Sequence, residues 1–150
     1  MDTNISRFKE LMDLLQLNDI LLVHIESDRC ADLPINAKKL KIEHRLQYIG
    51  EPSLHDEEKL ISYQVKVIIN LIDLSDPNEG CLVLKLVLGY VLSFSCSNIP
   101  QCNELLSDDS LKEVFIKVQI PKTLWPFIRQ QYYDMANRHS MHVPPLPWLK

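Results

Sequence analysis

Histidine and cysteine are the residues of this sequence whose side chains most readily bind metals or act in catalysis. The chain contains five histidines and four cysteines. His139 and His142 stand three residues apart beyond the end of an expected helix, where a positive group is favourable without any metal. His24 and His44 occur among the apolar residues of expected strands, which is typical of a hydrogen-bonded core imidazole. The sequence therefore predicts no metal site.

The remaining chemistry-bearing residues form no recognisable motif. The sequence contains no nucleophile elbow, P-loop, dinucleotide-binding fingerprint or zinc-protease motif, and it has only three glycines in total. The carboxylates Asp56, Glu57 and Glu58 are adjacent and predicted to be solvated. We expect no catalytic residue and no cofactor. The alternative is an enzyme or small-ligand-binding protein in which His24, His44 or Tyr48 lies near a pocket.

Length and composition indicate one soluble domain that spans residues 1–150. The net charge is −4 and no basic run is present, which argues against a nucleic-acid partner. There is no apolar run long enough to cross a membrane, and the first residues do not resemble a signal peptide, so we predict a cytoplasmic protein. Free thiols fit that location, with a Cys96–Cys102 disulfide as the alternative; the cysteines are Cys30, Cys81, Cys96 and Cys102.

A long antiparallel hairpin is predicted between Leu60 and Cys96. Apolar residues alternate along both arms, and the segment 75–80 between them has the Pro, Asn and Gly typical of a reversal. On the second arm the face with fewer apolar residues still carries Val83, Val87 and Val91. A helix or another subunit is expected to cover this second face, because large apolar patches are seldom left exposed on monomers.

Before the hairpin, apolar spacing predicts an amphipathic helix over 4–15 and strands over 17–25 and 39–51. The helix stripe is expected to contain Ile5 and Phe8. On the second strand Leu40, Ile42, His44, Leu46 and Tyr48 are expected to face inward. The segments 26–38 and 55–59 are expected to be a connection and a solvated turn.

After the hairpin, 97–109 is expected to be a long connection without secondary structure. A helix with an apolar stripe that includes Val114 and Val118 should begin at Ser110 and be interrupted at Pro121. A second helix, capped by Thr123, should run to about Asn137 or Arg138. The predicted fold class is α+β, with a four-stranded antiparallel sheet packed against C-terminal helices.

The sequence Trp-Pro-Phe-Ile-Arg at 125–129 resembles the start of the main helix in the SecB family of protein-export chaperones. The match continues into Asn137-Arg138 and the Pro-Leu-rich segment that contains Pro144, Pro145 and Leu146. Residues 63–67 and 81–95 are similar to the third and fourth strands of the family, and 17–20 to the start of its first strand. The resemblance covers nearly the whole chain, in the order of its elements.

This resemblance implies a homo-oligomer, a dimer of dimers, that holds unfolded polypeptides in apolar grooves without nucleotide or any covalent step. Asp19 and Glu79 match acidic residues that the family uses to dock to the motor SecA. Val23 stands where another acidic residue is expected, which argues against docking to SecA, and the implied client is an unfolded preprotein or an antitoxin polypeptide. The candidate peptide-binding residues are Leu40, Ile42, Phe94, Trp125, Tyr133 and Trp148.

The leading hypothesis is thus an ATP-independent chaperone for protein export or for control of an antitoxin, whose apolar grooves gain free energy by covering exposed aliphatic and aromatic side chains. The alternative reading of the six lining residues is that most belong to an ordinary core. A third hypothesis is an adaptor that binds one folded partner through the apolar strand face.

Overall fold

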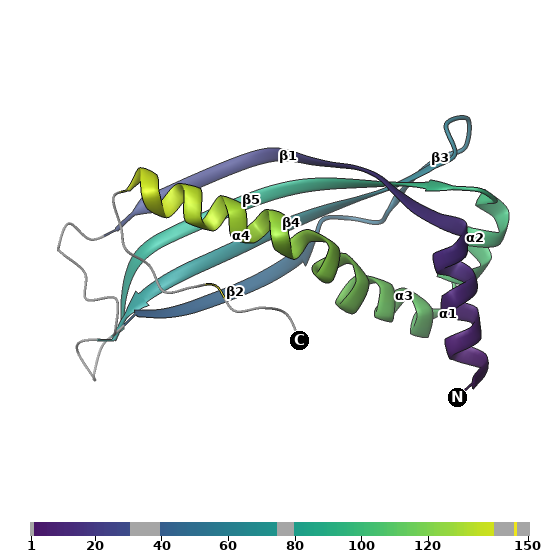
Figure 1. Cartoon of the computed structure of the whole chain (residues 1–150), viewed down its shortest axis with the longest axis horizontal. Helices are drawn as coiled ribbons and strands as arrows, with labels where there is room; N and C mark the ends of the chain where they lie inside the picture. Colours follow the sequence, from purple (N-terminus) through teal and green to yellow (C-terminus); the bar gives the residue numbers. More distant parts are fainter. Residues whose placement is uncertain (1, 31–39, 75–79, 140–145, 147–150) are drawn as a thin grey trace. The chain divides into compact units, whose positions relative to one another are not determined.

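The computed structural model describes residues 2–30, 40–74, 80–139 and 146 (Figure 1). Strands follow an N-terminal helix, and helices close the chain, as the α+β prediction requires. The elements are α1 (Asp2–Leu14), β1 (Leu15–Arg29), β2 (Leu40–Tyr48), β3 (Ser53–His55), β4 (Leu60–Asp73), β5 (Cys81–Cys96), α2 (Ile99–Leu106), α3 (Asp109–Val114), the π-helix η2 (Phe115–Gln119) and α4 (Ile120–Arg138).

The sheet has the strand order β1-β5-β4-β2, which contains the four predicted strands. The short strand β3 is an addition, because it pairs antiparallel with β4 and places Ser53 opposite Ser62. The chain divides into two compact units. Unit 1 comprises Met1–Leu21, Tyr48–Val65 and Tyr90–Thr123; unit 2 comprises Leu22–Gln47, Lys66–Gly89 and Leu124–Lys150. The single-domain organisation over 1–150 stays a prediction.

Unit 1 has an aromatic core built on the first half of β4 and the second half of β5. The ring centroids of Tyr63 and Phe94 are 6.1 Å apart, and Phe115 lies 5.5 Å from Tyr63 and 5.3 Å from Phe94. All three rings are buried, with Leu11 of α1 and Leu111 of α3 beside them in the core. The predicted strand alternation explains this core, since Tyr63 and Phe94 belong to the inward-facing sets.

The C-terminal helix continues through Pro121, which corrects the prediction of an interruption there. At the π-helix η2 the Ile120 N–H bonds to the Phe115 carbonyl, five residues back. Pro121 has no N–H to reach the next carbonyl, that of Ile116, and the Tyr48 hydroxyl donates to this carbonyl instead. The wide turn therefore carries the helix past the proline without an unpaired carbonyl.

The π-helix also changes which residues face inward. Ile120 and Leu124 are buried after Phe115, whereas Val114 and Val118, predicted to be inward, are exposed. Thr123, predicted to cap a helix, lies inside α4, where its hydroxyl donates to the Gln119 carbonyl at 2.8 Å. The end of α4 at Arg138 is as predicted.

Unit 2 places most of α4 against one face of the sheet. The buried side chains of this part of α4 occur at helical spacing. The helix reaches from β2 to β1, because Trp125 contacts His44 of β2, and His139 just after the helix contacts Ser27 of β1. Val83 and Val87, on the other face of β5, are also buried within the single chain. The buried α4 residues are Leu124, Trp125, Ile128, Tyr132, Met135 and Ala136.

Three further expectations were wrong. The segment 97–109 contains helix α2, which Asn98 caps by accepting from the Gln101 N–H at 3.1 Å, with Pro100 in the first turn. Helix α3 is capped by Asp108, whose carboxylate accepts from the Ser110 N–H, rather than by Ser110 itself. Strand β1 continues to Arg29, beyond the predicted end at Ile25. The reversal at 75–79 lies outside the described residues.

Candidate functional site

The helix-covered face of unit 2 brings β2 and α4 together. Leu40, Ile42 and Leu46 alternate with exposed residues along β2 and are half-buried. The His44 ring lies 4.9 Å from the Trp125 ring at an interplanar angle of 56°. His44 therefore faces the helix, as its predicted inward set requires, but it is exposed, so the prediction of a core imidazole is wrong. An aromatic side chain of α4 and the aliphatic edge of β2 thus form one partly open apolar surface.

Tyr133 extends this surface along α4. Its hydroxyl accepts a hydrogen bond from the Leu146 N–H at 3.1 Å, and the Leu146 side chain is only 1% exposed. The Arg129 guanidinium lies 6.0 Å from the centroid of the Tyr133 ring, at cation–π distance. The Tyr132 ring packs edge-on at 5.1 Å. The surface around Tyr133 therefore holds Leu146, which belongs to no helix or strand: its side chain is buried and its backbone N–H is hydrogen-bonded.

The six candidate peptide-binding residues have different surroundings. Leu40, Ile42 and Tyr133 are half-buried in unit 2. Trp125 of unit 2 and Phe94 of unit 1 are buried, with 3% and 5% exposed. Trp148 lies outside the described residues. In a single chain three of the candidates are therefore partly accessible, Trp125 is buried beneath the surface of β2 and α4, and Phe94 belongs to the aromatic core of unit 1.

Strand β1 has apolar side chains in solvent that the sequence did not single out as functional. Val23 is 61% exposed, although it lies in the middle of the strand. β1 is the end strand of the sheet order, and an end strand presents unpaired backbone groups. Asp19, a predicted docking residue, is exposed on the same strand, while Glu79 lies outside the described residues. The exposed apolar residues of β1 are Leu17, Leu21, Leu22, Val23 and Ile25.

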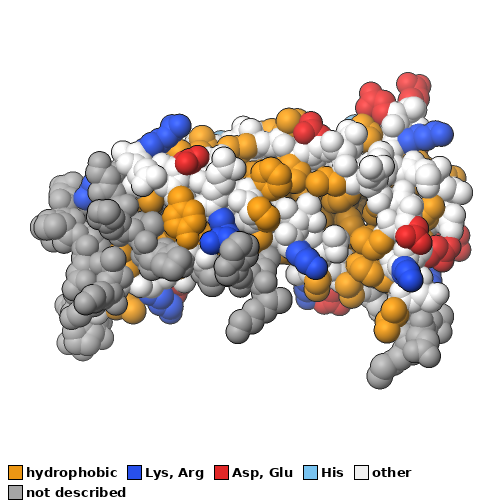
Figure 2. Space-filling model, viewed as in Figure 1, with side chains coloured by type: hydrophobic (Ala, Val, Ile, Leu, Met, Phe, Trp, Pro, Cys, Tyr) orange, Lys and Arg blue, Asp and Glu red, His pale blue; other side chains and the backbone are white. Residues whose placement is uncertain are grey.

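Unit 1 has a small apolar hollow between α1 and α3, with a volume of 220 Å³. Ile5, Phe8, Leu111 and Val114 contribute its apolar lining. Ile5 is exposed here, which corrects its predicted place on the buried stripe of the helix. Figure 2 shows hydrophobic side chains gathered at the surface near α1 and α3.

The histidines and cysteines form no metal centre within the described part of the chain. His24 lies 3.3 Å from the Glu26 carboxylate, and the His139 ring lies 3.0 Å from the Ser27 hydroxyl, whereas His142 is outside the described residues. The Cys96 and Cys102 sulfur atoms are 2.7 Å apart, both as free thiols. Burial, and then the hydrogen bond to Cys96, raise the pKa of Cys102 to about 12, which disfavours the reactive thiolate.

The three residues of the enzyme or small-ligand alternative, His24, His44 and Tyr48, are not gathered around one pocket in the described part of the chain. Burial raises the pKa of Tyr48 to about 12, and its hydroxyl is used by the Ile116 carbonyl. His44 and His24 lie on opposite faces of the sheet in unit 2.

None of the helices in the described residues is both long and apolar enough for a membrane span.

The whole architecture is similar to that of a solved chaperone. The SecB-like chaperone Rv1957 of Mycobacterium tuberculosis, in complex with a ChAD peptide from the Rv1956 HigA1 antitoxin, matches with a TM-score of 0.70 over 98% of this chain and 99% of that chain, at 13% identity. The chain has the SecB-like fold.

The predicted fold is thereby confirmed. A protein of unknown function from Streptococcus agalactiae aligns over 89% of this chain and 97% of its own, at 12% identity and a TM-score of 0.37, which is too low to support a conclusion. No protein-family model and no curated protein sequence matches the chain. Its function is therefore inferred from the SecB-like fold and from the residues of the chain itself.

Proposed function

We propose that the protein is an ATP-independent chaperone that holds unfolded or extended polypeptides on the apolar surface of β2 and α4. The contact between Tyr133 and Leu146 carries this proposal, because an enclosed aliphatic side chain with a satisfied N–H is the interaction that an extended client residue needs. The peptide complex of the SecB-like chaperone from M. tuberculosis supports a polypeptide ligand. The role is non-enzymatic and cytoplasmic.

The lining of this surface comprises Leu40, Ile42 and Tyr133, supported from beneath by Trp125. Covering a half-buried aliphatic side chain gains roughly 1 kcal/mol. Several such contacts give binding that is useful and reversible, as a holding chaperone requires. Trp148 and Phe94 stay in the proposal as further lining residues, and the buried Phe94 can be reached by a client only after a rearrangement.

Self-association is the second part of the proposal. The exposed apolar residues of β1 lie on an end strand, so a second copy can cover them and pair with the backbone at the same time. We propose that two copies form a dimer in this way and that two such dimers associate into a dimer of dimers. An antitoxin polypeptide or an unfolded preprotein is the proposed client, and docking to SecA through Asp19 stays a prediction.

The test is binding of an unfolded polypeptide, for example a reduced and carboxymethylated protein with a fluorescent label, measured by anisotropy without nucleotide. Replacing Ile42 by Ser and Tyr133 by Ala should weaken binding about tenfold, because two partly buried apolar contacts are lost. Gln47→Ser is the matched control, since Gln47 is an exposed polar residue of the same strand.

The control should bind like the unchanged protein. Absence of binding by the unchanged protein would refute the proposed function. Equal affinity for the Ile42→Ser/Tyr133→Ala variant, shown to be folded by circular dichroism, would instead place client binding on another surface.

A further inference from the structure

The face of the sheet opposite α4 in unit 2 is basic, although the chain as a whole has a net charge of −4. Its cationic side chains come from three neighbouring strands. Lys66 lies between Val65 and Val67, both fully buried on the helix side, so strand alternation places Lys66 on the opposite face. The same alternation places Lys85 of β5 between the buried Leu84 and Leu86. Lys41 and Arg45 of β2 complete the set, which we call the basic face.

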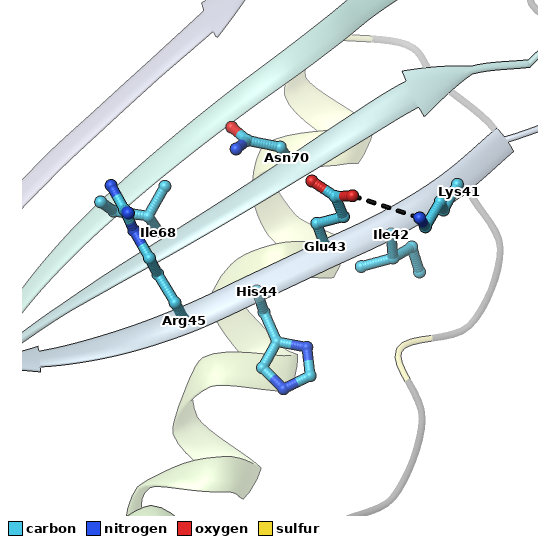
Figure 3. A pocket seen from close by; sticks show the side chains of 7 residues that line it. All are labelled: Lys41, Ile42, Glu43, His44, Arg45, Ile68 and Asn70. Atoms are coloured by element: carbon cyan, nitrogen blue, oxygen red, sulfur yellow. Dashed lines mark ion pairs between the residues drawn. The ribbon is translucent and has the colours of Figure 1, made fainter. Parts of the chain in front are cut away.

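Part of the basic face is a concavity of 590 Å³ lined by β2 and β4. Figure 3 shows Arg45, Glu43 and Asn70 on one side of the strands, and His44 on the side of the helix. Arg45 and Ile68 both line the concavity, and Ile68 is only 6% exposed. The floor of the concavity is thus partly aliphatic and its rim is charged.

The charges of the basic face are only partly balanced by acidic neighbours. Lys41 pairs with Glu43 at 3.2 Å, both about half exposed. Arg45, Lys66 and Lys85 have no ion-pair partner among the residues that the structure describes. On β1, which borders this face, strand alternation places the carboxylates of Glu26 and Asp28 on the same side as His24, and Glu26 lies 3.3 Å from the His24 ring. Three cations are therefore available to a ligand.

Asn70 gives the basic face a second recognition element. Its side-chain oxygen is buried and has no hydrogen-bond donor among the described residues. Asn70 lines the concavity together with Arg45, so a ligand there lies next to both, and rotation of the Asn70 amide is needed to bring its buried oxygen to the ligand. A buried carbonyl oxygen without a partner is costly, and a backbone N–H of a bound peptide would satisfy it.

We propose that the basic face binds an extended acidic polypeptide segment, with carboxylates at the three cations and a backbone N–H at Asn70. Charge complementarity selects this occupant. A nucleic acid fits less well, because the lining of the concavity offers no Phe, Tyr or Trp on which a base could stack and because the chain has a net negative charge. This surface goes beyond the proposed client site, which lies mainly on the helix-covered face of the same sheet and shares with the concavity the residue Ile42 of β2.

The test uses the full-length protein and a fluorescein-labelled peptide of about ten residues that alternates Glu and Val, which spans roughly 33 Å when extended. The control peptide has Lys in place of Glu. We expect the Glu peptide to bind, and its affinity to fall steeply between about 0.1 M and 1 M salt, since the Debye length falls from about 10 Å to 3 Å.

Reversing two charges of the basic face, Arg45→Glu with Lys85→Glu, should weaken the Glu peptide about tenfold or more. The matched control, Lys9→Glu with Lys122→Glu, makes the same change in net charge at helix positions and should alter the affinity less than twofold. The Tyr133→Ala variant should keep its affinity for the Glu peptide, because Tyr133 does not line the concavity, while its affinity for the unfolded client falls.

Three results would overturn the proposal. One is equal binding of the Glu and Lys peptides, and another is equal weakening by the two charge-reversal pairs. The third is a single-stranded oligonucleotide that binds more tightly than the Glu peptide with the same sensitivity to Arg45→Glu/Lys85→Glu. Because Tyr133 belongs to the client surface alone and Arg45 and Lys85 belong to the basic face alone, a failure here leaves the proposed chaperone function standing, and the reverse also holds.

Discussion

Replacing Val23 by Lys should dissociate the assembly that we propose to form through β1. Val23 is the most exposed apolar side chain of this end strand, and four other apolar residues of the strand are also exposed. Covering the exposed part of each side chain gains roughly 1 kcal/mol, so five residues in each of two copies contribute about 10 kcal/mol. Association itself costs about 4–15 kcal/mol, so gain and cost are of similar size and the loss of one apolar contact in each copy is enough to shift the balance toward monomers.

The substitution removes about 2 kcal/mol of apolar contact over two symmetric copies, which weakens the dimer about thirtyfold before the cost of burying two ammonium groups is added. The assay is light scattering coupled to size exclusion over a range of protein concentrations. The unchanged protein should elute as a multimer and Val23→Lys should shift toward the mass of one 17.5 kDa chain.

Val118→Lys is the matched control, because Val118 is 56% exposed on the π-helix and belongs to no strand. It should leave the mass unchanged. If the unchanged protein is a monomer at every concentration, or if both lysine variants lower the mass equally, the argument from the exposed apolar edge is wrong.

Three further predictions concern the buried tyrosines and the cysteines. Tyr48→Phe should lower the free energy of unfolding in urea by about 1–2 kcal/mol, because the Ile116 carbonyl loses its donor, whereas Tyr90→Phe should have no such cost, since the buried Tyr90 hydroxyl has no partner among the described residues. Burial raises the pKa of Tyr48 and Tyr90 to about 12, so both phenols stay neutral in the folded protein above pH 10. Since the unfolded chain ionises these phenols near pH 10, the free energy of unfolding should fall between about pH 10 and 12. Phenolate absorbance checks this, and ionisation of all tyrosines near pH 10 without unfolding would contradict it. A thiol reagent at pH 7 should label the exposed Cys30 and Cys81 rapidly and the other two cysteines only after unfolding; rapid labelling of all four by mass spectrometry would contradict the burial of Cys96 and Cys102.

The sheet could be predicted because alternation is a local property of the sequence. The inward sets of β4 and β5 became the core without exception from Ile61 to Leu71 and from Leu84 to Phe94. Helix α2 was missed because Asn98 and Pro100 suit a loop as well as a helix start. The passage through Pro121 depends on a hydroxyl from Tyr48, which is far away in the sequence.

The candidate site was harder to predict, for a physical reason. The same aromatic and aliphatic residues that line a groove also fill a core, so the sequence could not show that Trp125 and Phe94 are buried while Ile42 and Tyr133 are half-open. The exposed edge depends on β1 being the end strand, and the basic face depends on three strands lying side by side. Both are consequences of sheet order, which no short stretch of sequence contains.

The most direct test of the chaperone function is the aggregation of a chemically unfolded client diluted from denaturant, followed by light scattering without any nucleotide. We expect the protein to suppress aggregation when it is present in molar excess over the client, and added ATP to make no difference. Suppression should weaken in the Ile42→Ser/Tyr133→Ala variant and be retained by Gln47→Ser. Undiminished client aggregation at every ratio of folded protein to client would contradict the account.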